Sequence, residues 1–435
     1  MTAPINDPFP AVSKADWIAQ VANELKDPEA YDLLRWQSPE GFTVAPFYTT
    51  EELENLPLSN NQVAQKSIPG WLNAPQYVVS DSKDEACRVA LASGANALIL
   101  NLAGLSMLET SLLSRLLDGI KLSETPVFFR QIHPAANFVR ALQTVAPYQL
   151  KGGLLTSPDD TTAEATRLTM NSPQFRTVCI SGHDFHNAGA TATQELAFVL
   201  ARLTDVYDQL TGQGLTIDQL APKTMFSVSV GTSYFVEIAK LRALRALWKR
   251  LIAHYSPATT QYAFVHCQTS AFYNSTATPY TNLLRGTTEA MAAVVGGCDV
   301  LTVRPFDDLL KPPGEFSDRI ARNVSLLLAE ESHLDKVADP SAGSYYIETL
   351  TYQLVESAWA LFLRVEEKGG LTKATDFMQS EIEQSYQAKV EAVRGGKVLV
   401  GVTKFRVDEE GQTGRVFRQE FEGLLPNRRL AEEFE

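Results

Sequence analysis

The sequence predicts an α/β protein: a (β/α)8 barrel of the TIM type with an N-terminal extended arm and a C-terminal helical extension. Short apolar, β-branched segments alternate with longer segments of helical periodicity, which is typical of parallel strands joined by helices. Eight such segments favour a closed barrel over the alternative, a doubly wound open sheet. They are Gln76–Val79, Ala97–Asn101, Pro126–Arg130, Gly153–Thr156, Thr177–Ser181, Met225–Val230, Ala263–Thr269 and Val300–Arg304.

Residues 1–66 form the predicted arm. Ser13 is the expected N-cap of a helix over Ala15–Leu25, whose apolar residues recur at helical spacing. The segment Ser38–Gly41 then interrupts the chain, and Thr43–Tyr48 is short and apolar. An arm with so little core of its own has to pack on the barrel or on another chain. We therefore expect it to contact a second subunit.

Helices connect the strands of the barrel, to which we assign residues 67–335. They are clearest at Ala192–Leu210, Tyr234–His254 and Tyr280–Val295. The glycines Gly296 and Gly297 are expected to cap the last of these. Residues 336–435 form the C-terminal extension and a truncated linker. In and just before this region the sequence predicts three long amphipathic helices, Phe316–Glu331, Leu350–Lys368 and Thr372–Val393.

The composition excludes several classes of function. The 435 residues are 45% hydrophobic and 20% charged, as in a globular protein, and the formal net charge is -13. Such an acidic chain is not expected to bind nucleic acid or an anionic membrane. Its four cysteines are scattered, which favours free, buried thiols in a reducing compartment. No apolar signal core and no membrane-spanning run is found, so we expect a cytoplasmic protein.

Candidate site residues lie after the fifth predicted strand and at the end of the seventh. His266 and Gln268 are two residues apart, so their side chains point the same way at the end of a barrel strand, where sites lie. A purely structural histidine is the alternative. His183, Asp184 and His186 crowd the segment after the fifth strand and could transfer protons or form an idle cluster. None of the six histidines has the spacing of a metal-ligating pair, so no metal site is expected.

From about Thr177 to Arg406 the chain resembles the cobalamin-dependent acyl-CoA mutases, above all the methylmalonyl-CoA mutase family. The segments that carry this resemblance are GATATQELA at 189–197, FVEIAKLRA at 235–243, HCQTS at 266–270, PYTNLLR at 279–285 and DPSAGSYY at 339–346. The resemblance implies a barrel that threads coenzyme A along its axis. It also implies a separate flavodoxin-like domain that binds adenosylcobalamin, and a radical interconversion of methylmalonyl-CoA and succinyl-CoA.

The departures from the family pattern fall on its catalytic positions. Where active members read SGYHMQEAGA, the tyrosine and histidine become His183 and Asp184, and the glutamate becomes Asn187. An ionised Asp184 would repel the partial negative charge that the family's histidine stabilises. An upstream tyrosine motif is reduced to Trp71. Two strand-end motifs are replaced as well, at 155–159 and 301–304.

Taken together, these features resemble the small, non-catalytic subunit of heterodimeric methylmalonyl-CoA mutase. Residues 428–435 resemble the start of the linker to the cobalamin domain, and we expect that domain to be absent. The segments Pro8–Lys14 and Ser38–Val44 are similar to small-subunit N-termini. The expected partner is a full-length large subunit that binds adenosylcobalamin. This chain then has no catalytic or cofactor-binding residue, and at most a vestigial acyl-CoA contact at His266 and Gln268.

Two other hypotheses remain open at the level of sequence. The chain could be an active acyl-CoA mutase large chain that works with a separate cobalamin-binding subunit. Alternatively, the pattern Asp184-x-His186-x-x-Gly189 could donate His186 to the cobalt of cobalamin, although so few of its positions are fixed that the signal is weak.

Overall fold

A computed structural model describes residues 12–27, 29–54, 56, 62–79, 84–103, 109–256, 260–407 and 425–435. Its centre is a parallel barrel made of two five-stranded sheets, β3-β12-β11-β10-β9 and β4-β5-β6-β7-β8. The short strands β3 (Leu72–Asn73) and β4 (Gln76–Val78) are successive parts of one barrel strand, and so are β8 (Phe175–Arg176) and β9 (Val178–Ser181). Eight strand positions therefore close the circle, and the expected parallel α/β barrel is confirmed.

The sequence did not predict that two strands are split. At the first split, the amide of Ala74 donates to Leu301 on one side, whereas the carbonyl of Pro75 accepts from Ile99 on the other. Proline has no amide hydrogen, so the ladder cannot run through it unbroken. The unsplit strands are β5 (Leu98–Asn101), β6 (Val127–Arg130), β7 (Gly152–Leu154), β10 (Thr224–Val230), β11 (Val265–Thr269) and β12 (Val300–Thr302).

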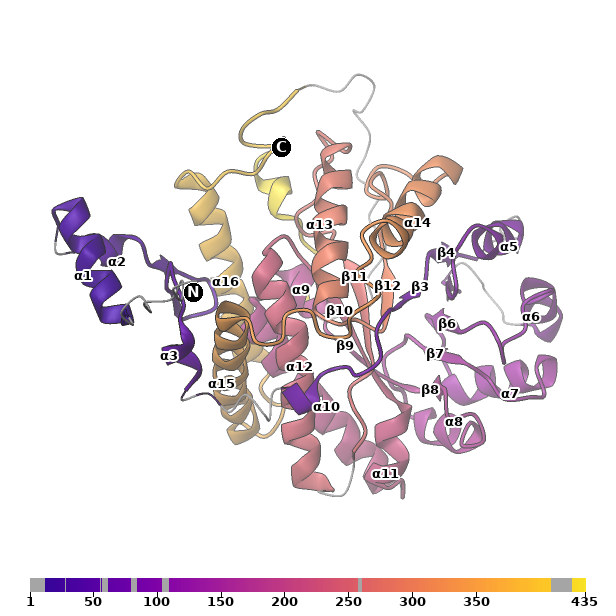
Figure 1. The fold of residues 1–435 in the computed structure, drawn as a ribbon. Helices are drawn as coiled ribbons and strands as arrows, with labels where there is room; N and C mark the ends of the chain where they lie inside the picture. Colours follow the sequence, from indigo (N-terminus) through magenta and orange to yellow (C-terminus); the bar gives the residue numbers. More distant parts are fainter. Residues whose placement is uncertain are drawn as a thin grey trace, which may run out of the picture.

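Helices cover the outside of the barrel (Figure 1). They are α5 (Asp84–Ala92), α6 (Thr110–Leu116), α7 (Ala135–Val145), α8 (Thr162–Leu168), α9 (His183–Ala188), α10 (Ala192–Gly212), α11 (Ile217–Leu220), η1 (Ala221–Lys223), α12 (Tyr234–Tyr255), α13 (Thr281–Val295) and α14 (Glu315–Glu330). Residues 183–188, expected as a loop, form the short helix α9, which ends at Gly189 with φ 106°. Gly297, with φ 84°, follows α13 as the expected helix-ending glycine.

Side chains fill the interior of the barrel. Along β5 and β6, Leu98, Leu100, Val127 and Phe129 pack outward against the helices, so the alternate residues Ile99 and Phe128 point inward. The inward residues form one apolar cluster: Ala74, Ala97, Ile99, Phe128, Leu155, Cys179, Met225 and Val300, with Leu72 and Phe264 packed against it. Such filling is usual for this fold, but it differs from the axial acyl-CoA passage that the family resemblance implies.

Two long helices, α15 (Tyr345–Glu367) and α16 (Thr375–Arg394), pack on the side of the barrel formed by α9, α10 and α12. Helix α15 begins a turn earlier than predicted because the Ser344 side chain caps it by accepting from the amide of Ile347. The last segment, 425–435, contains η2 (Leu430–Glu433) and lies over the carboxyl ends of the strands. There the amide of Arg428 donates to the Asn187 carbonyl and that of Leu430 to the Phe272 carbonyl.

The arm consists of α1 (Lys14–Leu25), α2 (Ala30–Leu33), α3 (Thr50–Leu53) and the hairpin of β1 (Trp36–Gln37) with β2 (Thr43–Val44). Its helices α1 and α2 project from the main body (Figure 1), whereas α3 packs on α15 and Val44 lies in the main core cluster. Ser13 caps α1 in a capping box with Asp16, as predicted. Residues 8–11 of the segment similar to small-subunit N-termini lie outside the described residues. Across the described ranges, no helix combines the length and apolarity needed to cross a membrane.

Candidate functional site

A chain of neutral polar groups crosses the mouth of the barrel at the carboxyl ends of β9, β10, β11 and β12. His183 at the start of α9 lies with Nδ1 2.7 Å from Ser229 Oγ and Nε2 2.7 Å from Ser227 Oγ. Ser227 Oγ lies 2.7 Å from His266 Nδ1. His266 Nε2 lies 3.0 Å from Thr302 Oγ1, which donates to the Ala74 carbonyl. We call these five side chains the mouth layer.

When both imidazoles are neutral, the partners fix the direction of every hydrogen bond in the mouth layer. A carbonyl only accepts, so Thr302 donates to Ala74 and therefore accepts from the Nε2–H of His266. His266 Nδ1 then accepts from Ser227, whose oxygen accepts from the Nε2–H of His183. His183 Nδ1 accepts from Ser229. Both imidazoles are neutral, and each uses both nitrogens inside the protein.

The electrostatics agree with this assignment. Burial holds the pKa of both His183 and His266 well below the usual value of 6.5, and the nearby Arg130 guanidinium lowers it further. Neither ring therefore carries a charge at neutral pH, and neither has a lone pair or proton that is not already engaged. A general acid or base needs one of these for the substrate, so the arrangement is suited to structure rather than to proton transfer.

Arg130 lies beside the mouth layer, at the end of β6. The sequence did not predict it as a site residue. Its Nη2 donates to Gln268 Oε1 at 3.1 Å. The same nitrogen lies 3.4 Å from His183 Nε2. With the tautomer assigned above, that nitrogen carries a proton and does not accept from Arg130. A charged residue at the carboxyl end of an apolar strand was the signal that could have found it. The structure thus brings together His183, His266 and Gln268, which the sequence singled out.

Asp184 and Asn187 do not belong to the mouth layer. The Asp184 carboxylate forms a two-pronged ion pair with Arg202 of α10, at 2.9 and 2.7 Å. The Arg202 guanidinium lies 4.1 Å from the centre of the Phe185 ring. The Asp184 carboxylate, which was expected to repel a thioester oxygen, is therefore paired with the Arg202 guanidinium of α10. Asn187 is buried, and its carbonyl accepts from the amide of Arg428.

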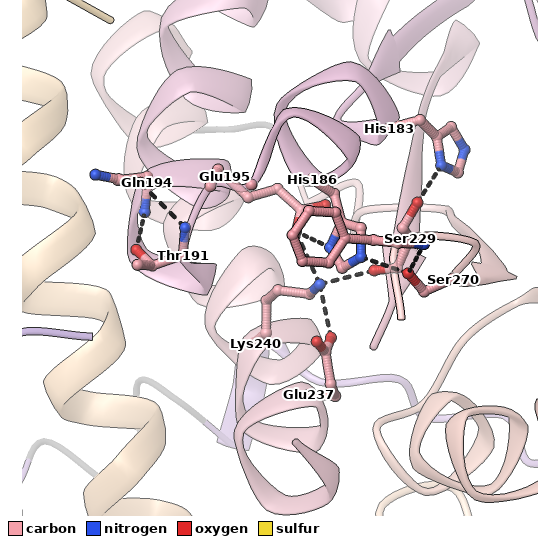
Figure 2. A network of polar contacts seen from close by, with 12 residues as sticks. His183, His186, Thr191, Gln194, Glu195, Ser229, Glu237, Lys240 and Ser270 are labelled. Atoms are coloured by element: carbon pink, nitrogen blue, oxygen red, sulfur yellow. Dashed lines mark hydrogen bonds and ion pairs between the residues drawn. The ribbon is translucent and has the colours of Figure 1, made fainter. Parts of the chain in front are cut away.

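His186 belongs to a second buried network, between α9, α10 and α12 (Figure 2). Its Nε2 lies 2.8 Å from Ser270 Oγ, and its Nδ1 lies 3.6 Å from Glu195 Oε2. Lys240 pairs with Glu195 at 2.9 Å and with Glu237 at 2.6 Å, and also donates to the Ser229 carbonyl. We call this the ion-pair network. Burial by itself would lower the pKa of Lys240, but the two carboxylates raise it above its usual value.

The surroundings of His186 do not fit a cobalt ligand. The side chain is buried, both of its nitrogens face partners, and its ring lies edge-on to Phe272 and Tyr273 at 6.1 and 6.3 Å between ring centres. A ligand to cobalamin has to present a free nitrogen to a large planar ring system. His186 does not do so. Within the described residues, no group of three or more His, Cys, Asp or Glu side chains is placed to hold a metal ion.

A small cavity of about 40 Å³ opens beside the mouth layer. Arg304 lies in its wall and pairs with Asp308 at 2.6 Å. A space of this size holds one or two water molecules or a small ion. The residues around it are Pro75, Gln76, Tyr77, Val78, Gln268, Thr302, Val303, Arg304, Pro305, Asp308, Pro313, Asp318 and Ala321.

The fold and the site define an α/β-barrel protein whose polar residues gather at the carboxyl ends of the strands. A family profile described as Methylmalonyl-CoA mutase matches residues 156–423. More than half of the chain is matched, and the chain belongs to the methylmalonyl-CoA mutase family. The resemblance found in the sequence is thereby confirmed.

Individual relatives match over different lengths. The chain is 34% identical over 402 residues to the methylmalonyl-CoA mutase small subunit of Porphyromonas gingivalis, covering 85% of this chain and 65% of that protein. It is 42% identical over 243 residues to the methylmalonyl-CoA mutase of Rhizobium meliloti, covering 55% and 34%. The corresponding enzyme of Escherichia coli is 38% identical over 248 residues. The chain thus spans less than two thirds of the length of these relatives.

Among solved structures, the dihydropteroate synthase of Xanthomonas albilineans covers 61% of this chain and 94% of its own, with a TM-score of 0.35 and 12% identity. The Yersinia pestis enzyme gives a TM-score of 0.35 and 10% identity.

Proposed function

We propose that this chain is the small, catalytically silent subunit of a heterodimeric methylmalonyl-CoA mutase. The large subunit then binds adenosylcobalamin and interconverts methylmalonyl-CoA and succinyl-CoA. The match to a small subunit supports this assignment because it covers 85% of the chain, whereas the match to the R. meliloti mutase covers 55%. We place the heterodimer in the cytoplasm, since all four cysteines are buried free thiols, as is usual in a reducing compartment.

The filled interior of the barrel is the main observation that supports the proposal that this chain is catalytically silent. An acyl-CoA that threads the barrel needs an open axis, but Ile99, Phe128 and Met225 meet there and are at most 1% exposed. The structure makes room for these large side chains: a Cβ on Gly153 would lie only 3.0 Å from Met225 Cε. Emptying the axis would expose a packed apolar cluster, which is strongly unfavourable. The axis of the barrel is therefore filled by side chains and leaves no passage for an acyl-CoA.

The chemistry of the mouth layer supports the same proposal. His183 occupies the position of the family's catalytic tyrosine, yet both of its nitrogens are used within the protein. Asp184 occupies the position of the catalytic histidine and pairs with Arg202. Neither group is arranged to donate a proton to a thioester oxygen. His266 and Gln268 keep their places, and an acyl-CoA contact at them stays a prediction.

The arm is the proposed contact with the large subunit. Helix α1 has no buried residue, although one of its faces is apolar. Leu33 is 80% exposed, and Leu34, Trp36 and Phe47 are also exposed. Apolar side chains gathered on a projecting element mark an interaction surface. A large subunit that covers this surface would supply the core that the arm lacks.

The proposed silence is tested by assaying the purified chain with adenosylcobalamin and methylmalonyl-CoA, with and without a full-length large subunit. We expect no succinyl-CoA from the chain alone, and a stable heterodimer with activity when both are present. Isomerisation by the chain alone would overturn the proposal. A third reaction adds a separate cobalamin-binding protein in place of the large subunit. Product in that reaction would favour an active large chain with a borrowed cobalamin subunit.

The role of the arm is tested by the variant Leu33→Asp. We expect its affinity for the large subunit to fall at least tenfold, because a carboxylate would have to lose water in an apolar interface. The matched control is Val89→Asp, which changes an exposed residue on α5, on the opposite side of the barrel from the arm. Equal affinities for the two variants would place the interface elsewhere.

A further inference from the structure

A row of aromatic side chains runs from the base of the arm onto the barrel. The ring centres of Tyr48 and Tyr346 lie 5.3 Å apart, and Tyr346 meets Phe235 edge-on at 5.3 Å. Tyr234 continues the row, because its ring lies 5.2 Å from that of Phe235. We call these four residues the aromatic strip. It joins the arm to the first turns of α12 and α15, which are distant from it in the sequence.

Part of the aromatic strip is exposed. Phe235 is 49% exposed, and Tyr345, which precedes Tyr346 at the start of α15, is 40% exposed. The other members of the strip are partly buried. Single exposed apolar side chains are common on protein surfaces, whereas several that contact one another are typical of an interaction surface. Aromatic side chains are also enriched where proteins meet.

Hydrogen bonds and packing hold the aromatic strip in place where the arm meets the barrel. The Tyr48 hydroxyl accepts from the amide of Ala45 at 3.0 Å. Glu40, between β1 and β2, accepts from the amide of Thr193 at the start of α10, at 2.8 Å. Helix α3, which follows Tyr48 in the sequence, packs on α15. A partner would therefore not have to order the aromatic strip, which lowers the cost of binding.

The size of the arm indicates that a partner bound to it also reaches the aromatic strip. The projecting helices α1 and α2 have 12 and 4 residues. A stable interface takes about 20–30 residues from each partner, so a subunit that covers these helices needs further contact area. The aromatic strip offers that area next to the arm. Tyr48 belongs to the arm, and the ring of the preceding Phe47 lies 4.9 Å from that of Trp17 on α1.

We propose that the aromatic strip is the centre of the interface with the large subunit, and that Phe235 enters an apolar pocket of that subunit. The inference rests on the proposed heterodimer. A second copy of this chain fits less well, because each copy carries a formal net charge of -13 and like charges oppose self-association. Aromatic residues at the centre of an interface contribute most of the binding free energy, and the contacts around them contribute little.

The proposal is tested by calorimetric titration of the full-length chain with a full-length large subunit. Phe235→Ala should lower the affinity about thirtyfold, as truncation of a central aromatic residue does. Phe235→Leu keeps an apolar side chain and should lose less. The matched control is Phe316→Ala on α14, which removes a ring that is 56% exposed and lies outside the aromatic strip. The control should bind as the wild type does.

Phe235→Glu keeps the test decisive if the alanine variant does not fold. It places a carboxylate in the first turn of α12, where the helix dipole favours a negative charge, so the Tm of the free chain should change little. In the complex the same carboxylate would have to lose its water in an apolar pocket. The affinity should therefore fall further than in Phe235→Ala.

Three results would overturn the proposal and leave the proposed function standing or open. The first is a heterodimer in which both Phe235→Ala and Phe235→Glu bind as tightly as the wild type, which would place the interface elsewhere. The second is that Phe316→Ala weakens binding as much as Phe235→Ala does. The third is a homodimer of the wild-type chain that Phe235→Glu dissociates, since the strip would then bind a second copy. Absence of any heterodimer would instead sink the proposed function, and this inference with it.

Discussion

The mouth layer and the ion-pair network lie on opposite sides of β10, yet they are built from different chemistry. The mouth layer is a chain of neutral hydrogen bonds that all run in one direction, and Arg130 lies at its edge, hydrogen-bonded to Gln268. The ion-pair network holds Lys240 between the carboxylates Glu195 and Glu237. Ser229 touches both, because its hydroxyl contacts His183 while its carbonyl accepts from Lys240.

This difference shows where the family resemblance resides. The ion-pair network comes from the segments that match the family, since Glu195 lies in 189–197, Glu237 and Lys240 in 235–243, and Ser270 in 266–270. His183, which departs from the family pattern, faces the mouth layer instead. Glu195, Glu237 and Lys240 of the family motifs therefore hold α10 and α12 to the barrel, whereas His266 of another family motif lies in the mouth layer beside the departing His183. Five changes would break or sharpen this comparison.

The largest effect is expected from Lys240→Met. It leaves Glu195 and Glu237 buried without their cation, which should lower the free energy of unfolding by ~3–5 kcal/mol. Urea denaturation followed by circular dichroism measures the loss. The control is Arg140→Gln, in a pair whose side chains are about half exposed, where less than ~1 kcal/mol is expected. Equal losses for the two variants would mean that the ion-pair network is not a stabilising unit.

Phe128→Ala tests the filled axis beneath the mouth layer. Removing a ring that is 1% exposed should cost about 3 kcal/mol, since the rigid barrel cannot close around the cavity. The same denaturation experiment measures this change. Phe316→Ala is the matched control, because that ring is 56% exposed and its loss should cost little. A wild-type stability for Phe128→Ala would show that the axis is not packed in solution.

Ser227→Ala interrupts the mouth layer at its centre. It leaves the Nε2–H of His183 without an acceptor and His266 Nδ1 without a donor, which should cost about 2 kcal/mol. Nitrogen NMR of the imidazoles should show the two tautomers assigned above in the wild type and a mixture in the variant. If the wild type already shows the opposite tautomers, the direction of the chain is wrong.

The smallest effects concern pH, and the two regions should respond with opposite sign. The pKa values of His183 and His266 are depressed by folding, so below about pH 6.5 the unfolded chain takes up protons that the folded chain does not. Stability should therefore fall as the pH falls, by about 1.4 kcal/mol per pH unit for each histidine. The variant His183→Gln should remove about half of this contribution.

Glu289, whose carboxylate accepts from the amide of Ser270 beside the ion-pair network, behaves in the other way. Burial raises its pKa from 4.5 to about 8, so its folded form holds a proton that the unfolded form releases. Its contribution is complete below about pH 4.5 and is lost as the pH rises through 8. Glu289→Gln should flatten that decline and leave the loss of stability at low pH, which is due to the histidines, unchanged. If the variant instead flattened the loss at low pH, the two pH ranges would have been assigned to the wrong groups.

Local periodicity in the sequence was enough to predict the alternation of strands and helices, the capping of α1 by Ser13 and the glycine after α13. It also placed His266 and Gln268 on one side of a strand, because side chains alternate along a strand with a period of two. The family could be recognised for a similar reason. Its motifs are contiguous stretches, and each stretch can be read without knowing what it contacts.

Only the tertiary structure decided what the polar residues do. Arg130 and Gln268 are 138 residues apart, and Thr302 reaches a carbonyl 228 residues away. That carbonyl belongs to Ala74, beside the Pro75 that splits the first strand, and it sets the direction of the whole mouth layer. Asp184 and Arg202 meet because α9 packs on α10. These residues become partners because closure of the barrel brings distant strand ends together. The periodicity of a sequence describes only local structure, so it does not predict which distant residues will meet.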